Sequence, residues 1–310
     1  MNLNIRERGN LLQVCIPTGG CRLGKCIFCN YGKSQLPDIN ELEIELNNIF
    51  NKYKEKEVIL LNAMGSILDK DEVPFKYVEI ICKLIQKYSF PNIVFETHYT
   101  TITEDICIKL TNLLPDRSLY IELGLESVNK NSLDSIHKKI DFKVLQDKIT
   151  ILKKYHIQLE GNVFLGIPFL SKEQRIQDSV DTICYALQNG FNEVVLFPCN
   201  LRLGTALYDL YLQNKYEPVS HLEVLTCLRR LPSNYLNRVS ISWYGDWNQF
   251  DNNGNVVNMH PLVSDKDISI QKMNKLSKLY QSFYNEYLIS DKREEVVSSY
   301  LKEVSICLKK

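Results

Sequence analysis

The chain has 310 residues, of which 45% are hydrophobic and 24% charged, and its 37 basic and 37 acidic residues give a formal net charge of zero. This length is enough for one large α/β domain with a substantial core. The charge balance argues against a protein whose main partner is a nucleic acid, because phosphate binding usually leaves a basic excess. The sequence shows neither a signal-peptide pattern nor a long apolar run, so we expect a cytoplasmic protein with no membrane partner.

Short β-rich runs alternate with longer amphipathic stretches along most of the chain. The pattern predicts strands over residues 11–18, 57–64, 92–98, 119–127, 158–167 and 193–200. It predicts helices over residues 39–53, 75–88, 103–114, 142–155 and 172–189. Such alternation implies parallel strands with right-handed crossovers, and six units fall short of the eight of a closed barrel. We therefore predict an α/β fold, a partial (βα)6 TIM-like barrel with its chemistry at the C-terminal strand ends.

The pattern changes near Ser240, where an aromatic stretch leads into a polar one and then into two helical stretches. We expect residues 1–238 to form the barrel, with a functional loop at residues 15–32. Residues 239–310 are expected to form a C-terminal elaboration that packs on the barrel, so that the whole is a single structural unit.

Four of the ten cysteines lie close together, between Cys15 and Cys29. Cys21, Cys26 and Cys29 follow the first predicted strand on a glycine-containing loop, where three thiolates can bind one face of an iron–sulfur cubane. The alternative is a zinc site that also uses Cys15. A four-cysteine zinc site usually needs two close pairs, however, and this segment has one CxxC. Cys15 also lies in an apolar strand-like run, where burial explains it.

The second half of this loop, Cys26-Ile27-Phe28-Cys29, resembles the signature C-x3-C-x-Φ-C of the radical S-adenosylmethionine (SAM) superfamily, with Phe28 at the aromatic position. The first gap differs, since four residues separate Cys21 from Cys26. The resemblance implies a [4Fe–4S] cluster bound by Cys21, Cys26 and Cys29, with S-adenosyl-L-methionine chelating the fourth iron. It further implies that a 5′-deoxyadenosyl radical is the reactive species and that an electron donor such as flavodoxin or ferredoxin is a partner.

The resemblance also places SAM along the C-terminal strand ends. Gly65 and Ser66 stand where the family usually has a Gly-Gly-Glu-like turn whose backbone receives the methionine ammonium, although an ordinary βα turn explains them equally well. Glu126 or Ser127 is expected to contact the ribose or methionine portion. Pro168 belongs to a turn similar to the one that borders adenine in the family.

Carboxylates recur on the inward side of the predicted strands. Glu122, Gly124 and Glu126 share one face of their strand, because side chains alternate along it. Two carboxylates on the inner side of a barrel strand are costly unless they have partners, which favours a ligand-binding role. Glu96 and His98 end the preceding strand, and a core position explains His98 equally well.

Residues 65–69, 124–127, 168–170 and 198–205 resemble the radical SAM subunit of archaeosine synthase. The Asn-, Lys- and Ile-rich composition is typical of an AT-rich bacterial genome. Together these features lead us to expect a bacterial lyase that cleaves the C–N bond of queuine and releases preQ1 (7-aminomethyl-7-deazaguanine). The alternatives are a radical SAM enzyme that modifies a 7-deazaguanine in tRNA and a non-enzymatic four-cysteine zinc protein.

A small 7-deazaguanine base needs an enclosed pocket in which a carboxylate reads the guanine-like edge and an aromatic ring stacks on its face. The candidate substrate-binding residues are Glu160, Asn162, Asn200, Arg202, Trp243 and Asp246. Simple packing of the C-terminal segment is the other explanation of the aromatic residues around Asp246. No side chain can be assigned a catalytic role from the sequence.

Overall fold

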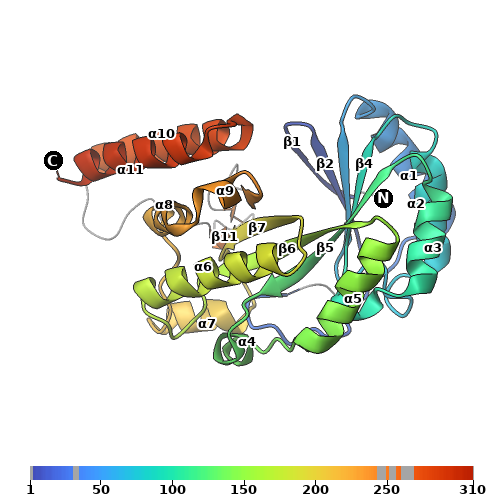
Figure 1. Ribbon diagram of the computed structural model, residues 1–310, viewed down its shortest axis with the longest axis horizontal. Coiled ribbons are helices and arrows are strands. Elements are labelled where there is room, and N and C mark those ends of the chain that lie inside the picture. The colour runs from blue at the N-terminus through green and yellow to red at the C-terminus, as the bar shows by residue number, and fades with distance from the viewer. Residues whose placement is uncertain (1–2, 31–34, 243–248, 251–255, 260–268, 310) are drawn as a thin grey trace. The chain divides into compact units, whose positions relative to one another are not determined.

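The computed structural model describes residues 3–30, 35–242, 249–250, 256–259 and 269–309 (Figure 1). The chain forms two compact units. Unit 1 contains residues 1–24, 31–124 and 140–160, and unit 2 contains residues 25–30, 125–139 and 161–310. The chain therefore crosses from one unit to the other after residues 24, 30, 124, 139 and 160. The predicted boundary between residues 238 and 239 stays a prediction.

Unit 1 is a sheet covered by helices. Its strands are β1 (Asn4–Arg8), β2 (Leu11–Ile16), β3 (Val58–Ala63), β4 (Asn92–Glu96) and most of β5 (Ser118–Glu126). Its helices are α1 (Ile39–Lys52), α2 (Phe75–Ile85), the short 3-10 helix η1 (Tyr99–Thr101), α3 (Glu104–Leu113) and α5 (Phe142–Lys154). β1 pairs antiparallel with β2, and β2 to β5 pair in parallel in chain order. Figure 1 shows α1, α2 and α3 together on one side of these strands.

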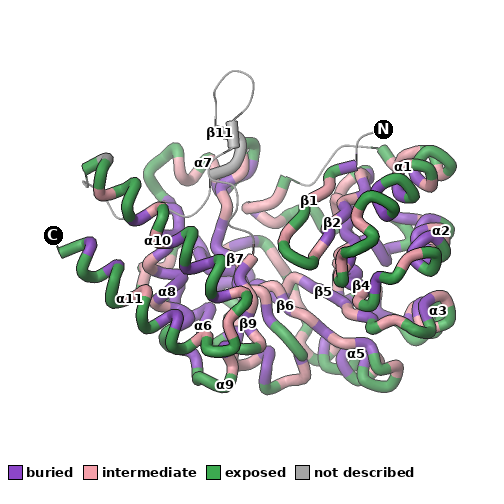
Figure 2. The backbone as a smooth tube through the Cα atoms, turned by 90° about the horizontal axis from the view of Figure 1, so that it is seen from above, coloured by how far each residue is buried: buried purple, intermediate pink, exposed green. Residues whose placement is uncertain are grey.

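The helices of unit 1 form because each has a polar cap and one apolar face. Asp38 caps α1 by accepting hydrogen bonds from the N–H groups of Asn40 and Glu41, and the helix buries Leu42 and Leu46 among other residues. Thr103 caps α3 in the same way. In Figure 2 these helices therefore show buried and exposed stretches in alternation.

Unit 2 continues the pattern of strands and helices. It contains the end of β5, α4 (Lys130–Ser135), most of β6 (Gln158–Leu165), α6 (Lys172–Gln188), β7 (Glu193–Pro198), β8 (Leu201–Arg202), α7 (Ala206–Leu212) and α8 (His221–Arg230). It ends with α9 (Ser233–Leu236), β9 (Val239–Ile241), β10 (Gln249–Phe250), β11 (Val256–Met259), α10 (Ile270–Ile289) and α11 (Arg293–Lys309). β7 and β9 are parallel, and β10, β11 and β8 form a small antiparallel sheet.

Among the described residues, the main sheet has eight strands in the order β1-β2-β3-β4-β5-β6-β7-β9. Its six central strands, β2 to β7, are the six that the sequence predicts, which confirms the α/β partial-barrel fold class. β1 and β9 are additions at the two ends of this order, and the two helical stretches expected near the C-terminus are α10 and α11. No helix in the described ranges has the length and apolarity needed to cross a membrane.

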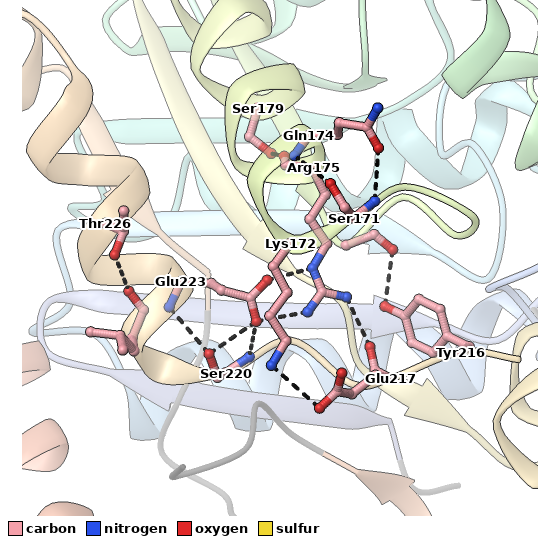
Figure 3. Close-up of polar contacts among 12 residues, drawn as sticks. Ser171, Lys172, Gln174, Arg175, Ser179, Tyr216, Glu217, Ser220, Glu223 and Thr226 are labelled. Atoms are coloured by element: carbon pink, nitrogen blue, oxygen red, sulfur yellow. Dashed lines mark hydrogen bonds and ion pairs between the residues drawn. The ribbon is translucent and has the colours of Figure 1, made fainter. Parts of the chain in front are cut away.

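A buried ion pair joins α6 to α8 in unit 2 (Figure 3). Arg175 and Glu223 are only 3% and 4% exposed, and their side chains form two hydrogen bonds, one of them 2.7 Å from Nη2 to Oε2. Arg175 also donates to the carbonyl oxygen of Glu217 at 2.9 Å. Glu223 accepts from both the N–H and the hydroxyl of Ser220, each at 2.9 Å. The charges are thus buried with their hydrogen-bonding capacity largely satisfied, the condition under which such a pair is tolerated.

We predict that Glu223→Ala lowers the free energy of unfolding by about 3–5 kcal/mol, because it leaves the Arg175 guanidinium buried without its charge partner. Urea denaturation of the purified protein measures the change. The double variant Arg175→Met/Glu223→Leu should recover most of the loss, since no unpaired charge remains. Glu173→Ala, which removes the exposed bridge to Arg230, is the control and should leave the midpoint nearly unchanged. A Glu223→Ala midpoint equal to that of this control would contradict the prediction.

Candidate functional site

In unit 1, the beginning of the cysteine loop is fixed by the carboxylate of Glu72. Its Oε1 accepts a hydrogen bond from the N–H of Arg22 at 2.7 Å, and its Oε2 accepts one from the N–H of Ser66 at 2.6 Å. Arg22 directly follows Cys21, and Ser66 lies in the turn that follows β3. Glu72 is 9% exposed, so its carboxylate is largely shielded from water, and the hydrogen bond to Ser66 is buried. One buried carboxylate therefore ties the first cysteine to the turn predicted to bind SAM.

Gly65 makes this contact possible. Its φ of +153° disfavours any residue with a side chain, and a Cβ there would lie 2.0 Å from Oε2 of Glu72 and 3.3 Å from Cα of Cys21. The Thr18 hydroxyl donates to the carbonyl oxygen of Met64 at 2.9 Å and fixes the chain just before the turn. The position thus requires glycine because a carboxylate and the cysteine loop approach its backbone closely.

The turn is also bonded to the end of β4. The N–H of Ile67 donates to the carbonyl oxygen of Glu96 at 3.3 Å, and the N–H of His98 donates to the Ser66 hydroxyl at 3.2 Å. The His98 ring is half-buried and contacts the Thr100 hydroxyl through Nδ1 at 2.8 Å, so it caps η1. The Ser66 side chain therefore positions the end of β4, while its N–H is held by Glu72.

An ion pair on the exposed side of the loop adds a weaker restraint. The Arg22 guanidinium lies 2.8 Å from Oδ2 of Asp69, and this hydrogen bond raises the pKa of Arg22. The Arg22 side chain is 56% exposed, so the bridge is screened by water and contributes less than the buried contacts of Glu72.

In unit 2, the second half of the cysteine loop is held by backbone hydrogen bonds. The N–H of Ile27 donates to the carbonyl oxygen of Ile136 at 3.2 Å, and the carbonyl oxygen of Ile27 accepts from the N–H of Leu207 at 2.9 Å. Phe28 stacks on Phe164 of β6, with ring centroids 4.6 Å apart. The aromatic residue between the two cysteines thus anchors this part of the loop on the sheet of unit 2.

The thiols of Cys21, Cys26 and Cys29 are half-buried and form no disulfide. The N–H of Cys29 donates to the carbonyl oxygen of Cys26 at 3.1 Å, which gives this CxxC a tight turn. The described residues contain no group of three Cys, His, Asp or Glu side chains already arranged to hold a metal ion, and this applies to zinc as well as to iron. The chemistry of the donor set fits an iron–sulfur cluster, because cysteine thiolates are the usual ligands of such clusters and three of them leave one iron open.

Glu126, a predicted SAM contact, ends β5 in a left-handed conformation with φ of +61°. Its Oε1 lies 2.8 Å from Nζ of Lys138, and the two side chains are 10% and 13% exposed. A non-glycine residue rarely adopts this conformation, and such strain is often found at functional sites. Sequence reasoning missed Lys138, which lies in a polar stretch typical of a solvated surface.

Ser127 is fully buried, and its hydroxyl already has partners inside unit 2. It donates to Oδ1 of Asp178 at 3.1 Å and accepts from the N–H of Asn129 at 2.9 Å. Ser132 donates to the same Asp178 oxygen at 2.7 Å. Burial raises the pKa of Asp178, whereas the hydrogen bonds from the two serine hydroxyls lower it, and burial has the larger effect. Contact of Ser127 with SAM stays a prediction. In this structure the Ser127 hydroxyl stabilises the fold of unit 2 through its hydrogen bonds to Asp178 and Asn129.

Gly166 lies in the turn after β6 that precedes Pro168, and its surroundings require glycine. Its φ is +124°, and a Cβ would lie 2.8 Å from both Cβ of Cys199 and the hydroxyl of Tyr216. Tyr216 donates to the Gly166 carbonyl oxygen at 2.9 Å. Burial raises the pKa of the Cys199 thiol to about 12, so this cysteine stays protonated at neutral pH. Pro168, the predicted neighbour of adenine, is buried directly after this turn.

The predicted substrate residues are distributed over several elements. Glu160 and Asn162 lie on β6 with alternate spacing and are partly exposed, and Asn200 follows β7. Arg202 lies on β8, where its backbone is opposite Asn258 of β11. The two remaining candidates, Trp243 and Asp246, lie outside the described residues. Their roles in substrate binding stay predictions.

Sequence reasoning missed Glu72, the residue with the most direct connection to the loop. It belongs to the polar run Asp69-Lys70-Asp71-Glu72, which is typical of a solvated turn. The only available signal was Gly65, since a glycine directly after a buried strand often marks a close approach of another group to the backbone.

Comparison with known proteins identifies relatives of low identity. No protein-family model matches the chain. The chain is 25% identical over 229 residues to archaeosine synthase subunit beta of Methanosarcina acetivorans, and the match covers 71% of this chain and 66% of the relative. It is 24% identical over 238 residues to archaeosine synthase subunit beta of Thermococcus kodakarensis, covering 72% of this chain and 73% of the relative. The chain thus spans just under two thirds of the first of these proteins.

Solved structures share the fold. The Elp3 protein of the archaeon Methanocaldococcus infernus superposes with a TM-score of 0.55 at 13% identity, over 92% of this chain and 65% of that one. Methylornithine synthase superposes with a TM-score of 0.53 at 14% identity, over 87% of this chain and 82% of that one. The fold, the three-cysteine loop and the similarity to archaeosine synthase subunit beta support the resemblance of the chain to the radical SAM superfamily. Within that class its relatives include the beta subunit of archaeosine synthase, and the predicted cofactors, a [4Fe–4S] cluster and SAM, are those of the class.

We predict that Glu72→Gln weakens the cysteine loop. A glutamine offers only one acceptor oxygen for the N–H groups of Arg22 and Ser66, so one buried N–H loses its partner at a cost of about 1–3 kcal/mol. Urea denaturation should show this loss, and iron analysis after anaerobic reconstitution should show lower cluster occupancy. The control is Asp71→Asn, an exposed neighbour in the same turn, which should behave as the wild type. Equal stability and equal iron content in the two variants would contradict the prediction.

Proposed function

We propose that this protein is a queuine lyase, a radical SAM enzyme that cleaves the C–N bond between the cyclopentenediol and the aminomethyl group of queuine and releases preQ1. The observation that carries the proposal is the match to archaeosine synthase subunit beta over 229 residues. Archaeosine is a 7-deazaguanine nucleoside, and queuine is a free base built on the same ring. The formal net charge of zero suits a small free base better than a polyanion.

In this proposal Cys21, Cys26 and Cys29 hold the cluster. When bound, the cluster and SAM supply a 5′-deoxyadenosyl radical that removes a hydrogen atom from the substrate. The task of the protein is to orient both groups and to exclude water. Glu72 holds Arg22, next to Cys21, through the backbone N–H. The packing of Phe28 on Phe164 holds the segment that carries the other two cysteines.

SAM binding is assigned to the strand ends. In this proposal the backbone at Gly65 and Ser66 would receive the methionine ammonium, because backbone carbonyl oxygens accept hydrogen bonds from N–H donors. The paired Glu126 and Lys138 offer one acceptor and one donor group for the polar parts of SAM. The turn that ends in Pro168 borders the adenine. This chemistry requires an electron donor, such as a reduced flavodoxin or ferredoxin.

A second candidate is a radical SAM enzyme that modifies a 7-deazaguanine within tRNA. The names of the two relatives favour it, since archaeosine is found in tRNA. It requires RNA binding whose affinity falls steeply with salt concentration, because phosphate contacts release counterions. The binding of unmodified tRNA at two salt concentrations therefore separates this candidate from a free-base lyase.

We predict that Cys26→Ser and Cys29→Ser abolish the brown colour and the broad visible absorbance of the anaerobically reconstituted protein, because serine does not replace a thiolate in this cluster. The matched control is Cys184→Ser, since Cys184 is also partly exposed but lies on α6, outside the loop. Absorbance spectra and iron and sulfide contents measure the difference. A colourless wild-type protein that retains zinc after purification would instead support the four-cysteine zinc alternative.

We predict that the reconstituted protein converts queuine to preQ1 in the presence of SAM and dithionite, with 5′-deoxyadenosine as a coproduct. Mass spectrometry of the small molecules measures both products. 5′-Deoxyadenosine without preQ1 would refute queuine as the substrate while leaving the radical SAM class intact. No SAM cleavage by a protein with a full complement of iron would contradict the proposed activity as a whole.

A further inference from the structure

A row of polar side chains crosses four neighbouring strands of unit 1 near their C-terminal ends. In the sheet register Cys15 of β2 is opposite Asn62 of β3, and Glu96 of β4 is opposite Glu122 of β5. The β3–β4 register runs to Leu61 and Phe95, so the next residues, Asn62 and Glu96, are neighbours as well. Residues opposite each other on parallel strands point to the same face of the sheet. The four side chains therefore form one row.

The row is more polar than the level of the sheet just below it. Two residues earlier on each strand, the register places Gln13, Leu60, Val94 and Tyr120 side by side on the same face. At that level β3 and β4 contribute the apolar side chains Leu60 and Val94, as expected for a packed barrel interior. The change from Leu60 to Asn62 and from Val94 to Glu96 thus marks the depth at which the interior becomes suited to a polar ligand.

Asn62 gives the clearest sign that a ligand belongs here. Its side chain is 97% buried, since its exposure is 3%, and its Oδ1 accepts no hydrogen bond within the described structure. A buried acceptor without a donor costs about 1–3 kcal/mol, so native structures rarely leave one unsatisfied. The register places this oxygen in the row beside Glu96, where it faces the same side of the sheet as both carboxylates.

The row lies next to the turn assigned to SAM. Asn62 is three residues before Gly65 on the same chain segment, and the carbonyl oxygen of Glu96 accepts from the N–H of Ile67 directly after that turn. A group bound at the row is therefore close to the end of the sheet at which the radical chemistry is proposed to begin.

We infer that Asn62, Glu96 and Glu122 bind an organic ammonium group, namely the protonated amine of the substrate. Neighbouring strands are about 4.8 Å apart, so oxygens from adjacent strands can surround one nitrogen. A protonated amine brings two or three N–H donors and a positive charge. The donors satisfy Asn62, and the positive charge interacts favourably with the carboxylates of Glu96 and Glu122, which sit opposite each other in the register.

The identity of this amine rests on the proposed function. Queuine carries a secondary amine and preQ1 a primary one, and both are protonated near neutral pH. The same nitrogen forms the C–N bond that the proposed reaction breaks. Binding at the row would therefore fix the reacting bond, while the ring of the base binds elsewhere. SAM also carries an ammonium group, so the test must separate the two sources.

The test uses the reconstituted protein without reductant, so that nothing is turned over, and measures dissociation constants by calorimetry. The ligands are preQ1, 7-methyl-7-deazaguanine, which has the same ring without the amine, and SAM. We expect Asn62→Leu, Glu96→Gln and Glu122→Gln each to weaken preQ1 binding by about tenfold or more, the loss expected from one charge-assisted hydrogen bond. The affinities for 7-methyl-7-deazaguanine and SAM should change less than about twofold, because neither ligand uses the row.

Two further variants distinguish a specific loss of binding from misfolding. Asn62→Asp keeps the acceptor and adds a negative charge, so it should bind preQ1 at least as tightly as the wild type, a result that damaged protein cannot give. Gln13→Leu, on the same face one level below, should leave all three affinities unchanged. If the variants weaken the binding of preQ1 and of 7-methyl-7-deazaguanine equally, the inference is overturned, and the row instead binds the edge of the deazaguanine ring. If only the binding of SAM is weakened, the inference is overturned, and the row instead binds the methionine ammonium of SAM.

A wild-type protein that binds neither base would refute the 7-deazaguanine proposal without deciding the role of the row. The row is then tested with 4-fluorobenzylamine, an aromatic methylammonium that lacks the deazaguanine ring, and with neutral 4-fluorobenzyl alcohol. Fluorine NMR line broadening should occur with the amine only, and Glu96→Gln and Glu122→Gln should abolish it. Equal broadening by the alcohol, or broadening that both variants retain, would overturn the inference.

Discussion

The organisation of the candidate site depends on one contact, the approach of the Glu72 carboxylate to the bare backbone of Gly65. The carboxylate occupies the space that a Cβ would need, with only 2.0 Å between that position and Oε2. From there it holds Ser66 on one side and Arg22 on the other. Any side chain at residue 65 would displace the carboxylate and release both segments at once. The turn and the first cysteine are thus positioned by a single buried anion, and not by separate sets of contacts.

The parallel register explains why residues far apart in sequence act at one level. Cys15, Asn62, Glu96 and Glu122 come from four strands that are separated by whole helices in the chain, yet the pairing places them in a line. A single polar residue on one strand, with apolar neighbours on the others, would be a buried polar group without hydrogen-bonding partners. The line of oxygen acceptors on β3, β4 and β5 forms instead a surface with a defined chemical preference, and the unsatisfied oxygen of Asn62 shows that this preference is not met within unit 1.

Much of the fold followed from the sequence, because periodicity reports burial directly. The six predicted strands correspond to β2 through β7, and the five helices between them correspond to α1, α2, α3, α5 and α6. Several elements that were missed are short, such as β9 and α9, or have mixed polarity, such as β1 with its sequence Asn-Ile-Arg-Glu-Arg. The ten-residue helix α8 was missed as well, although it has an apolar face. Periodicity could not identify Glu72 and Lys138 as site residues, because their roles depend on contacts between segments that only the folded turns bring together. The roles assigned to the cysteines rest on spacing and chemistry, which the sequence shows in full.

Gly65 and Gly166 show the same physical solution at two strand ends, one in each unit. At each, positive φ and an approaching polar side chain exclude a Cβ, with Glu72 in the first case and Tyr216 in the second. Each polar group also bonds to the turn itself, Glu72 to the N–H of Ser66 and Tyr216 to the carbonyl oxygen of Gly166. A turn held in this way has little freedom to rearrange, because its conformation is fixed by buried hydrogen bonds and not by its own side chains. Such rigidity suits a site that must hold a reactive cofactor, where small displacements of the reacting atoms reduce the rate strongly.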